Sequence, residues 1–195
     1  MTVKQQIRFA KLGVHALLCL PLAWLVYLSV NSLLGVDPAE KLVKELGFYS
    51  ITILWLCLSM TPLKRLTGLP HWIAIRRAVG LWCFAYVTLH LLVFLLFWAG
   101  LQKSIIVEEI SQRPYIMVGM AAWLLLIPLA VTSLNGLRRW MGSSRWQSLH
   151  RLIYPIAILA LLHLVWLSKL DFMEPLIFFV VLILLFYVRF RRSGK

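Results

Sequence analysis

The chain alternates between apolar runs of about 18 to 25 residues and short polar segments. A helix needs about 20 apolar residues to cross a hydrocarbon core roughly 30 Å thick. Six segments meet this requirement, and the pattern therefore predicts an all-α membrane protein, a bundle of six transmembrane helices. The predicted spans are residues 9–33, 46–63, 78–99, 114–134, 149–168 and 173–190.

Prolines and a glycine refine the boundaries of these spans. Pro114 and Pro175 suit the first turn of a helix, where a missing N–H costs nothing. Thr61-Pro62 and Asn135-Gly136 predict the ends of the second and fourth spans.

Composition agrees with a protein embedded in lipid. Of the 195 residues 62% are hydrophobic and 14% are charged, and the mean hydropathy is +0.86. A soluble domain is nearer half apolar. We therefore expect a single helical membrane domain over residues 1–195, with no soluble nucleotide-binding domain.

The net charge of +13 is spread over short clusters between the apolar runs. This distribution indicates membrane topology and argues against nucleic-acid binding. Of the 20 basic residues, 15 fall on one side of the predicted spans. All seven acids fall on the other side: Asp37, Glu40, Glu45, Glu108, Glu109, Asp171 and Glu174. The positive-inside rule then places both termini in the cytoplasm.

Two histidines, His90 and His163, lie deep in the third and fifth predicted spans. His90 follows Arg77 by 13 residues, which is roughly 20 Å of helix. His163 lies about 14 residues into its own outward-running span, at nearly the same depth. Neutral imidazole is a common axial ligand of haem iron. The matched pair is therefore predicted to ligate one haem; the alternative is an interhelical hydrogen bond for each ring.

Two further histidines lie nearer the cytoplasmic side. His150 is at the inner edge of the fifth span. His15 is in the part of the first span that crosses the inner leaflet, and it is the best candidate partner for His150 if a second iron is bound. His150 and His163 are roughly 140° out of line on an ideal helix, although a kink at Pro155 would change that angle. Hydrogen bonding between helices again accounts for either histidine without an iron.

Arg76 and Arg77 could pair with haem propionates or a flavin phosphate, or merely mark topology. No catalytic residue is predicted, because no nucleophile–base pair and no H-E-x-x-H motif is present. The three cysteines, Cys19, Cys57 and Cys83, stand apart in apolar runs and support neither a disulfide nor a zinc or iron–sulfur site.

Three motifs together resemble one family. RRAVGLWCFAYVTLH, SQRPYIMVG and WQSLHRLIYP with His163 following are similar to MsrQ, the haem-binding membrane subunits of bacterial methionine sulfoxide reductase systems. The resemblance covers nearly the whole chain. It implies a multi-pass protein of the bacterial inner membrane that binds haem b and FMN. It also implies electrons drawn from the quinone pool and delivered to a periplasmic molybdopterin reductase, MsrP, that repairs oxidised methionine.

More distantly, the pattern is similar to the ferric-reductase transmembrane domain, which carries two histidines on each of two helices. Here the fifth span has His150 and His163, whereas the third has only His90. Arg76 or Arg77 falls where an inner histidine would lie. The resemblance thus implies an outer haem on His90 and His163, while an inner haem would need His15 or another group.

The sequence therefore favours an electron-transfer subunit of an oxidoreductase complex, distinct from the subunit that reduces the sulfoxide. The alternatives are a small polytopic transporter, and a membrane scaffold in which the histidines are structural. Visible absorbance separates these possibilities, because only the first predicts a haem Soret band that shifts on reduction.

The predicted topology can be tested by thiol labelling in intact spheroplasts. A cysteine introduced at Ser104 should react with a membrane-impermeant reagent, because the acidic loops are expected to face the periplasm. One introduced at Ser143 should react only after permeabilisation. Labelling at Ser143 in intact cells, with none at Ser104, would contradict the assignment.

Overall fold

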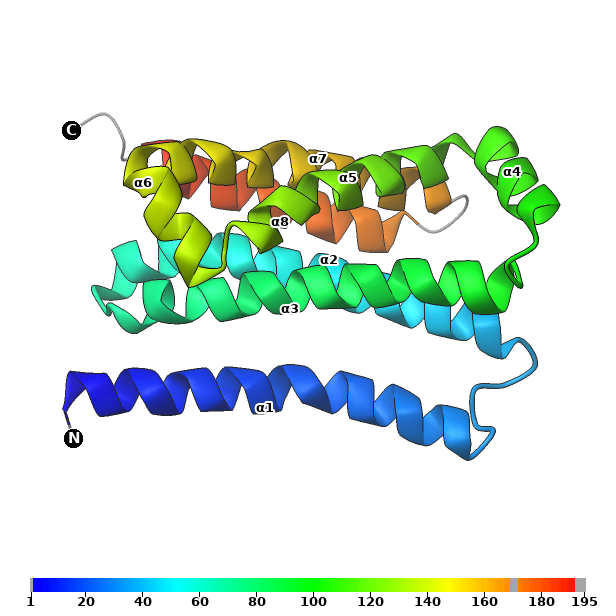
Figure 1. Ribbon diagram of the computed structural model, residues 1–195, viewed down its shortest axis with the longest axis horizontal. Helices are drawn as coiled ribbons and strands as arrows, with labels where there is room; N and C mark the ends of the chain where they lie inside the picture. The colour runs from blue at the N-terminus through cyan, green and yellow to red at the C-terminus, as the bar shows by residue number, and fades with distance from the viewer. Residues whose placement is uncertain (1, 169–171, 192–195) are drawn as a thin grey trace. The chain divides into compact units, whose positions relative to one another are not determined.

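A computed structural model describes residues 2–168 and 172–191 (Figure 1). Within these ranges the chain forms helices and turns and no strand. The chain divides into two compact units, residues 1–101 and residues 102–195, called here the N-terminal and C-terminal units. The charged positions Lys169, Asp171, Arg192 and Lys195 lie outside the described residues.

The N-terminal unit consists of three long helices, followed by a short π-helical turn (Figure 1). Helix α2 packs along α3, and α1 packs on α3. Their bounds are α1 Val3–Val30, α2 Pro38–Thr67, α3 His71–Val93 and η1 Phe94–Trp98. Because α3 contacts both other helices, it is the central helix of this unit, and its side chains Val79, Cys83 and Tyr86 are buried.

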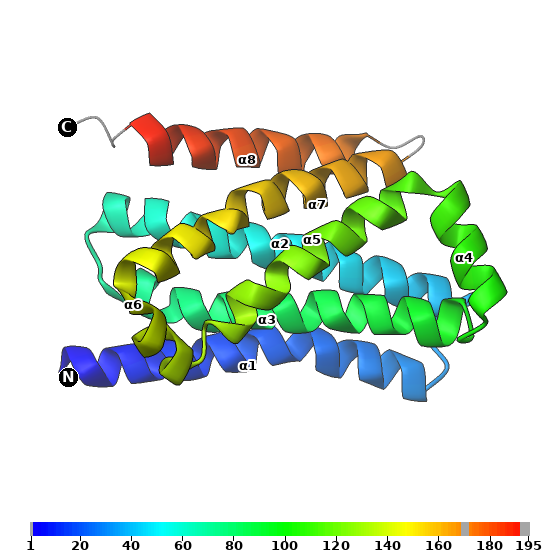
Figure 2. The same ribbon diagram turned by 45° about the horizontal axis from the view of Figure 1, so that its top comes forward.

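The C-terminal unit is built on the antiparallel pair α5 and α7, with α8 beside α7 and the short α4 before α5 (Figure 2). Helix α6 bends at Gly142, whose φ of 75° is left-handed and therefore suits a glycine. The bounds are α4 Lys103–Gln112, α5 Pro114–Val131, α6 Asn135–Leu149, η2 His150–Leu152, α7 Ile153–Leu167 and α8 Met173–Arg191.

The helices confirm the predicted class of all-α membrane protein. Five described segments are long and apolar enough to cross a membrane, by length and composition: Val3–Val30, Pro38–Thr67, His71–Trp98, Pro114–Val131 and Gly136–Leu167. The sixth predicted span coincides with α8. The placement of both termini in the cytoplasm stays a prediction.

The starts of two helices follow the expected signals. Pro114 is the first residue of α5, and Pro175 lies in the first turn of α8. Helix α2 begins earlier than predicted, because Asp37 accepts a hydrogen bond from the N–H of Glu40 (2.9 Å) and Pro38 supplies a preset first turn.

The prediction that Thr61-Pro62 ends the second span is wrong. Helix α2 runs through Pro62 to Thr67 and ends at Gly68, whose N–H bonds to the carbonyl of Lys64 (2.9 Å). A proline removes one ladder hydrogen bond, and the packing of this part of α2, where Pro62 itself is buried, compensates for it. Asn135-Gly136 also differs from expectation: α5 ends at Val131, and Asn135 begins the helix α6.

Some contacts at the predicted cytoplasmic ends of the helices are resolved within each unit. In the N-terminal unit a contact of 3.1 Å between His71 Nε2 and Gln6 Oε1 brings the starts of α1 and α3 together. In the C-terminal unit Arg138 lies over the ring of Trp146, and Arg189 over that of Tyr154, both at 5.0 Å. The separation of charge between the two sides of the membrane stays a prediction.

Candidate functional site

His90 is held by a backbone contact across the N-terminal unit. Its Nδ1 lies 2.9 Å from the carbonyl oxygen of Val43, in the second turn of α2. The ring also sits over Gly47 of the same helix, where an added Cβ would lie 3.2 Å from Cε1. The side chain is partly buried.

His163 is held in the same way in the C-terminal unit. Its Nδ1 lies 2.6 Å from the carbonyl oxygen of Tyr115, in the first turn of α5. The ring sits over Gly119, where an added Cβ would lie 2.8 Å from Nδ1. The Tyr115 ring meets the imidazole edge-on, with 5.7 Å between the ring centroids.

The two arrangements share one spacing, a carbonyl at position i and a glycine at i+4. In an α-helix the carbonyl at i also accepts the N–H of residue i+4. A histidine that uses the second lone pair of that oxygen must therefore come close to the backbone of residue i+4, and only glycine leaves that space open. We call Val43 with Gly47, and Tyr115 with Gly119, the two histidine seats.

The seats fix the chemistry of each ring. A carbonyl oxygen only accepts hydrogen bonds, so Nδ1 of His90 and of His163 must carry the proton. In the neutral ring Nε2 then holds the lone pair, which is the form that binds a metal. No group of three or more His, Cys, Asp or Glu side chains able to hold a metal ion occurs among the described residues. Single histidines that each offer one Nε2 suit haem, because the porphyrin provides four nitrogen ligands to the iron and the protein adds only the axial ones.

His150 is placed at the junction of α6 and α7. Its Nδ1 lies 3.0 Å from the carbonyl oxygen of Trp146, and the two rings stack with 3.8 Å between centroids. The irregular geometry expected at Pro155 lies here instead, in the 3-10 turn His150–Leu152. Pro155 falls in the first turn of α7, where a missing N–H disturbs little.

His15 differs from His90, His150 and His163 in its hydrogen bonding. Its Nδ1 accepts a hydrogen bond from the indole N–H of Trp82 (2.9 Å). A neutral ring that accepts at Nδ1 carries its proton on Nε2, which is not the form that binds iron through Nε2. Together with the hydrogen bond from the hydroxyl of Tyr86 to the carbonyl of Leu18 (2.7 Å), this contact attaches α1 to α3.

Arg76 and Arg77 lie on α3, because this helix begins at His71, seven residues before the predicted span. The guanidinium of Arg76 donates a hydrogen bond to Thr61 Oγ1 at 3.3 Å. The backbone carbonyl of Arg76 accepts one from the thiol of Cys57 at 3.7 Å. Arg76 is thereby oriented towards the end of α2.

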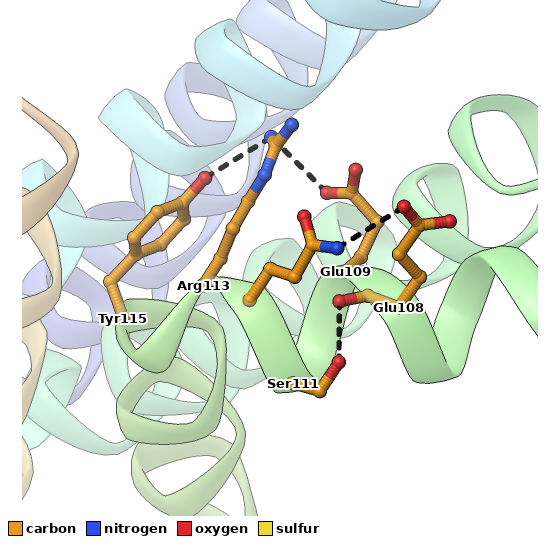
Figure 3. A network of polar contacts seen from close by, with 6 residues as sticks. Glu108, Glu109, Ser111, Arg113 and Tyr115 are labelled. Atoms are coloured by element: carbon orange, nitrogen blue, oxygen red, sulfur yellow. Dashed lines mark hydrogen bonds and ion pairs between the residues drawn. The ribbon is translucent and has the colours of Figure 1, made fainter.

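A polar network surrounds the start of α5 (Figure 3). A guanidinium nitrogen of Arg113 lies 3.1 Å from Glu109 Oε2 and donates to the Tyr115 hydroxyl at 3.4 Å. The hydrogen bond to Tyr115 raises the pKa of Arg113 above its ordinary value, so the guanidinium stays charged. Gln112 donates to Glu108 at 3.2 Å.

Sequence reasoning found the histidines but missed the seats. The available signal was a lone glycine inside an apolar helix, which costs about 1 kcal/mol relative to alanine and so often has a packing reason. Gly47 and Gly119 both carry that signal. Nothing in the sequence indicates which carbonyl each histidine would reach.

The seats make different demands on their glycines, which substitution can measure. Gly119→Ala should lower the unfolding temperature in detergent, because a Cβ 2.8 Å from His163 Nδ1 must displace the ring; crowding of this kind typically costs about 1–3 kcal/mol. Gly47→Ala should have a smaller effect, since its contacts of 3.2 and 3.3 Å need less movement.

Gly80→Ala is the matched control. Its Cβ would make an ordinary contact of 3.6 Å with the sulfur of Cys57, in another apolar helix. The seat at Gly119 is refuted if Gly119→Ala is as stable as Gly80→Ala.

Two comparisons with known proteins identify the family of the chain. Residues 46–161 match the family described as "Ferric reductase like transmembrane component". This range includes Gly47, His90, Gly119 and His150, and ends just before His163.

One relative is the "Protein-methionine-sulfoxide reductase heme-binding subunit MsrQ" of Ralstonia nicotianae. The two sequences are 40% identical over 191 residues, which is 97% of this chain and 88% of the relative. The match extends through both units and includes both histidine seats. The chain therefore belongs to the ferric-reductase-like transmembrane family and, within it, to the MsrQ subunits.

Proposed function

We propose that the protein is a membrane electron-transfer subunit that binds haem b through His90 and His163. The observation that carries this proposal is the pair of matching seats. In each unit a backbone carbonyl accepts a hydrogen bond from the Nδ1–H of the histidine, and a glycine lets the ring approach. A relative at 40% identity is named as a haem-binding subunit, which supports the choice of haem as the ligand.

The chain contributes to such a site in two ways. The Nδ1–H bonds to Val43 and Tyr115 orient both rings and increase the basicity of Nε2. The apolar faces of the helices keep water away from the rings. Haem itself supplies a one-electron carrier whose potential depends on ligand identity, hydrogen bonding and burial. The proposal that both histidines bind the same iron rests on the depth match expected from the sequence.

We further propose that electrons pass outward to a periplasmic molybdopterin reductase that repairs methionine sulfoxide in proteins of the cell envelope. Reduction of a sulfoxide to a thioether takes two electrons and two protons and releases water. Oxidation of a quinol to a quinone supplies two of each, so the quinone pool is a balanced donor.

FMN is proposed by family resemblance, with Arg76 and Arg77 as candidate phosphate contacts. The proposed location is the bacterial inner membrane.

His150 is proposed to act where electrons enter. Its Nδ1 bond to Trp146 gives it the same tautomer as the two seated histidines, so Nε2 could ligate an inner haem or take a proton from quinol. The contact of His15 with Trp82 favours the second role, because it leaves the proton on Nε2 of His15.

Single substitutions test the outer haem. His90→Ala and His163→Ala should each abolish the same haem signal in reduced-minus-oxidised spectra of the detergent-purified protein, because each removes one axial ligand. His71→Ala is the control: it removes a histidine on the same helix as His90, at the Gln6 contact, and should keep full haem content. Full haem retention in either seat variant would reject the pairing, and a colourless, folded wild-type protein would favour a transporter or a scaffold.

His150→Ala should slow quinol-dependent haem reduction while the outer haem stays spectrally normal. If His150 and His15 ligate a second haem, His15→Ala and His150→Ala should lose the same haem in a pyridine haemochrome assay. If His150 accepts a proton, neither variant loses haem. Unchanged haem content together with an unchanged reduction rate in His150→Ala would exclude both roles.

A further inference from the structure

Arg113 forms the whole junction between α4 and α5. It is both the C-cap residue of α4 and the N-cap residue of α5, with φ −124° and ψ 84°. Its N–H donates to the carbonyl of Glu109 at 3.0 Å, which closes the end of α4. On the other side, the start of α5 has no side-chain hydrogen bond to its cap. In that turn Pro114 carries no N–H, and the N–H of Ile116 bonds to the carbonyl of Arg113 at 2.9 Å. No side chain adds a further hydrogen bond that would hold this turn in place.

The side chain of Arg113 connects the two helices through its guanidinium (Figure 3). Its guanidinium contacts the carboxylate of Glu109 at 3.1 Å on one side and the hydroxyl of Tyr115 at 3.4 Å on the other. The contact with Glu109 is an ion pair by distance and lacks the alignment of a hydrogen bond. It spans one turn of α4, so Arg113 connects that turn to the first turn of α5.

Tyr115 connects the contacts of Arg113 to His163. Its hydroxyl accepts a hydrogen bond from Arg113, and its carbonyl accepts one from the Nδ1–H of His163. Its ring meets the imidazole in an edge-on contact. A movement of the first turn of α5 would therefore change the length and angle of the bond to His163. All four side chains belong to the C-terminal unit.

We propose that Arg113, held between Glu109 and Tyr115, is a positioning residue that orients the iron-binding nitrogen of His163 by fixing the Tyr115 carbonyl. The proposal rests on the function proposed above, in which His163 binds haem. It adds a role for a helix junction that does not itself contact the ligand nitrogen.

The effect on the haem has a definite sign. A firm bond from Nδ1–H to a carbonyl makes Nε2 more basic, which favours ferric over ferrous iron. Loosening that bond should raise the midpoint potential. Charge alone acts differently, because removing a positive charge near the haem disfavours the gain of an electron and removing a negative charge favours it.

Three variants separate position from charge. Arg113→Gln, Glu109→Gln and Tyr115→Phe should each raise the midpoint potential of the outer haem in a redox titration of the full chain. A purely electrostatic effect would move the first two in opposite directions and leave Tyr115→Phe unchanged. The double variant Arg113→Gln/Tyr115→Phe should shift the potential no further than the larger single shift, because both changes break one connection.

Lys103→Gln is the matched control, since it removes the same charge from the other end of α4, away from the contacts of Tyr115. It should leave the potential unchanged or slightly lower. Hydrogen exchange on haem-free protein gives a second readout: the first turn of α5 should exchange faster in Arg113→Gln and Tyr115→Phe than in wild type or Lys103→Gln.

The results distinguish the two proposals. If wild type binds haem through His163 but potentials and exchange rates are unchanged in Arg113→Gln and Tyr115→Phe, the positioning role is wrong and the proposed function stands. If His163→Ala retains the haem, the proposed function is wrong, and faster exchange in the variants would then show a structural clamp only. Opposite shifts in Arg113→Gln and Glu109→Gln would replace positioning by electrostatics.

Discussion

A histidine ring among apolar transmembrane helices has to satisfy its N–H inside the protein, because lipid offers no hydrogen-bond partner. In both units the partner is a backbone carbonyl that already belongs to a helix, Val43 for His90 and Tyr115 for His163. This choice requires a glycine one turn further on and fixes the proton on Nδ1. The close packing of α2 on α3, and of α5 on α7, is compatible with these rings for that reason.

Departures from regular helix occur close to the histidines. The π-helical turn Phe94–Trp98 begins one turn after His90, and the 3-10 turn His150–Leu152 begins at His150 itself. Such departures are frequent at functional sites, since they change the direction of side chains without ending the helix. The bend at Gly142 likewise turns α6 before it reaches His150.

The two ends of the C-terminal unit serve different purposes. At the basic end, cations lie over aromatic rings, as Arg138 does over Trp146, in the manner of residues that meet a membrane surface. At the acidic end, the ion pair of Glu109 with Arg113 lies beside the seat of His163. The pair is partly buried, and its interest here is geometric, because it holds the Arg113 guanidinium beside the first turn of α5.

The sequence alone determined the membrane class, the approximate helices and the candidate histidines, because these follow from apolar length and from the rarity of imidazole in lipid. The proline signal correctly predicted the start of a helix at Pro114, where only neighbouring residues of the chain matter. It failed at Pro62, where the packing of α2 outweighs the loss of one backbone hydrogen bond. The seats at Gly47 and Gly119 were decided only by tertiary structure. The histidine and the carbonyl that it contacts are separated by 47 positions in one seat and by 48 positions in the other. A sequence pattern carries no information on which carbonyl such a distant ring will meet when two helices pack.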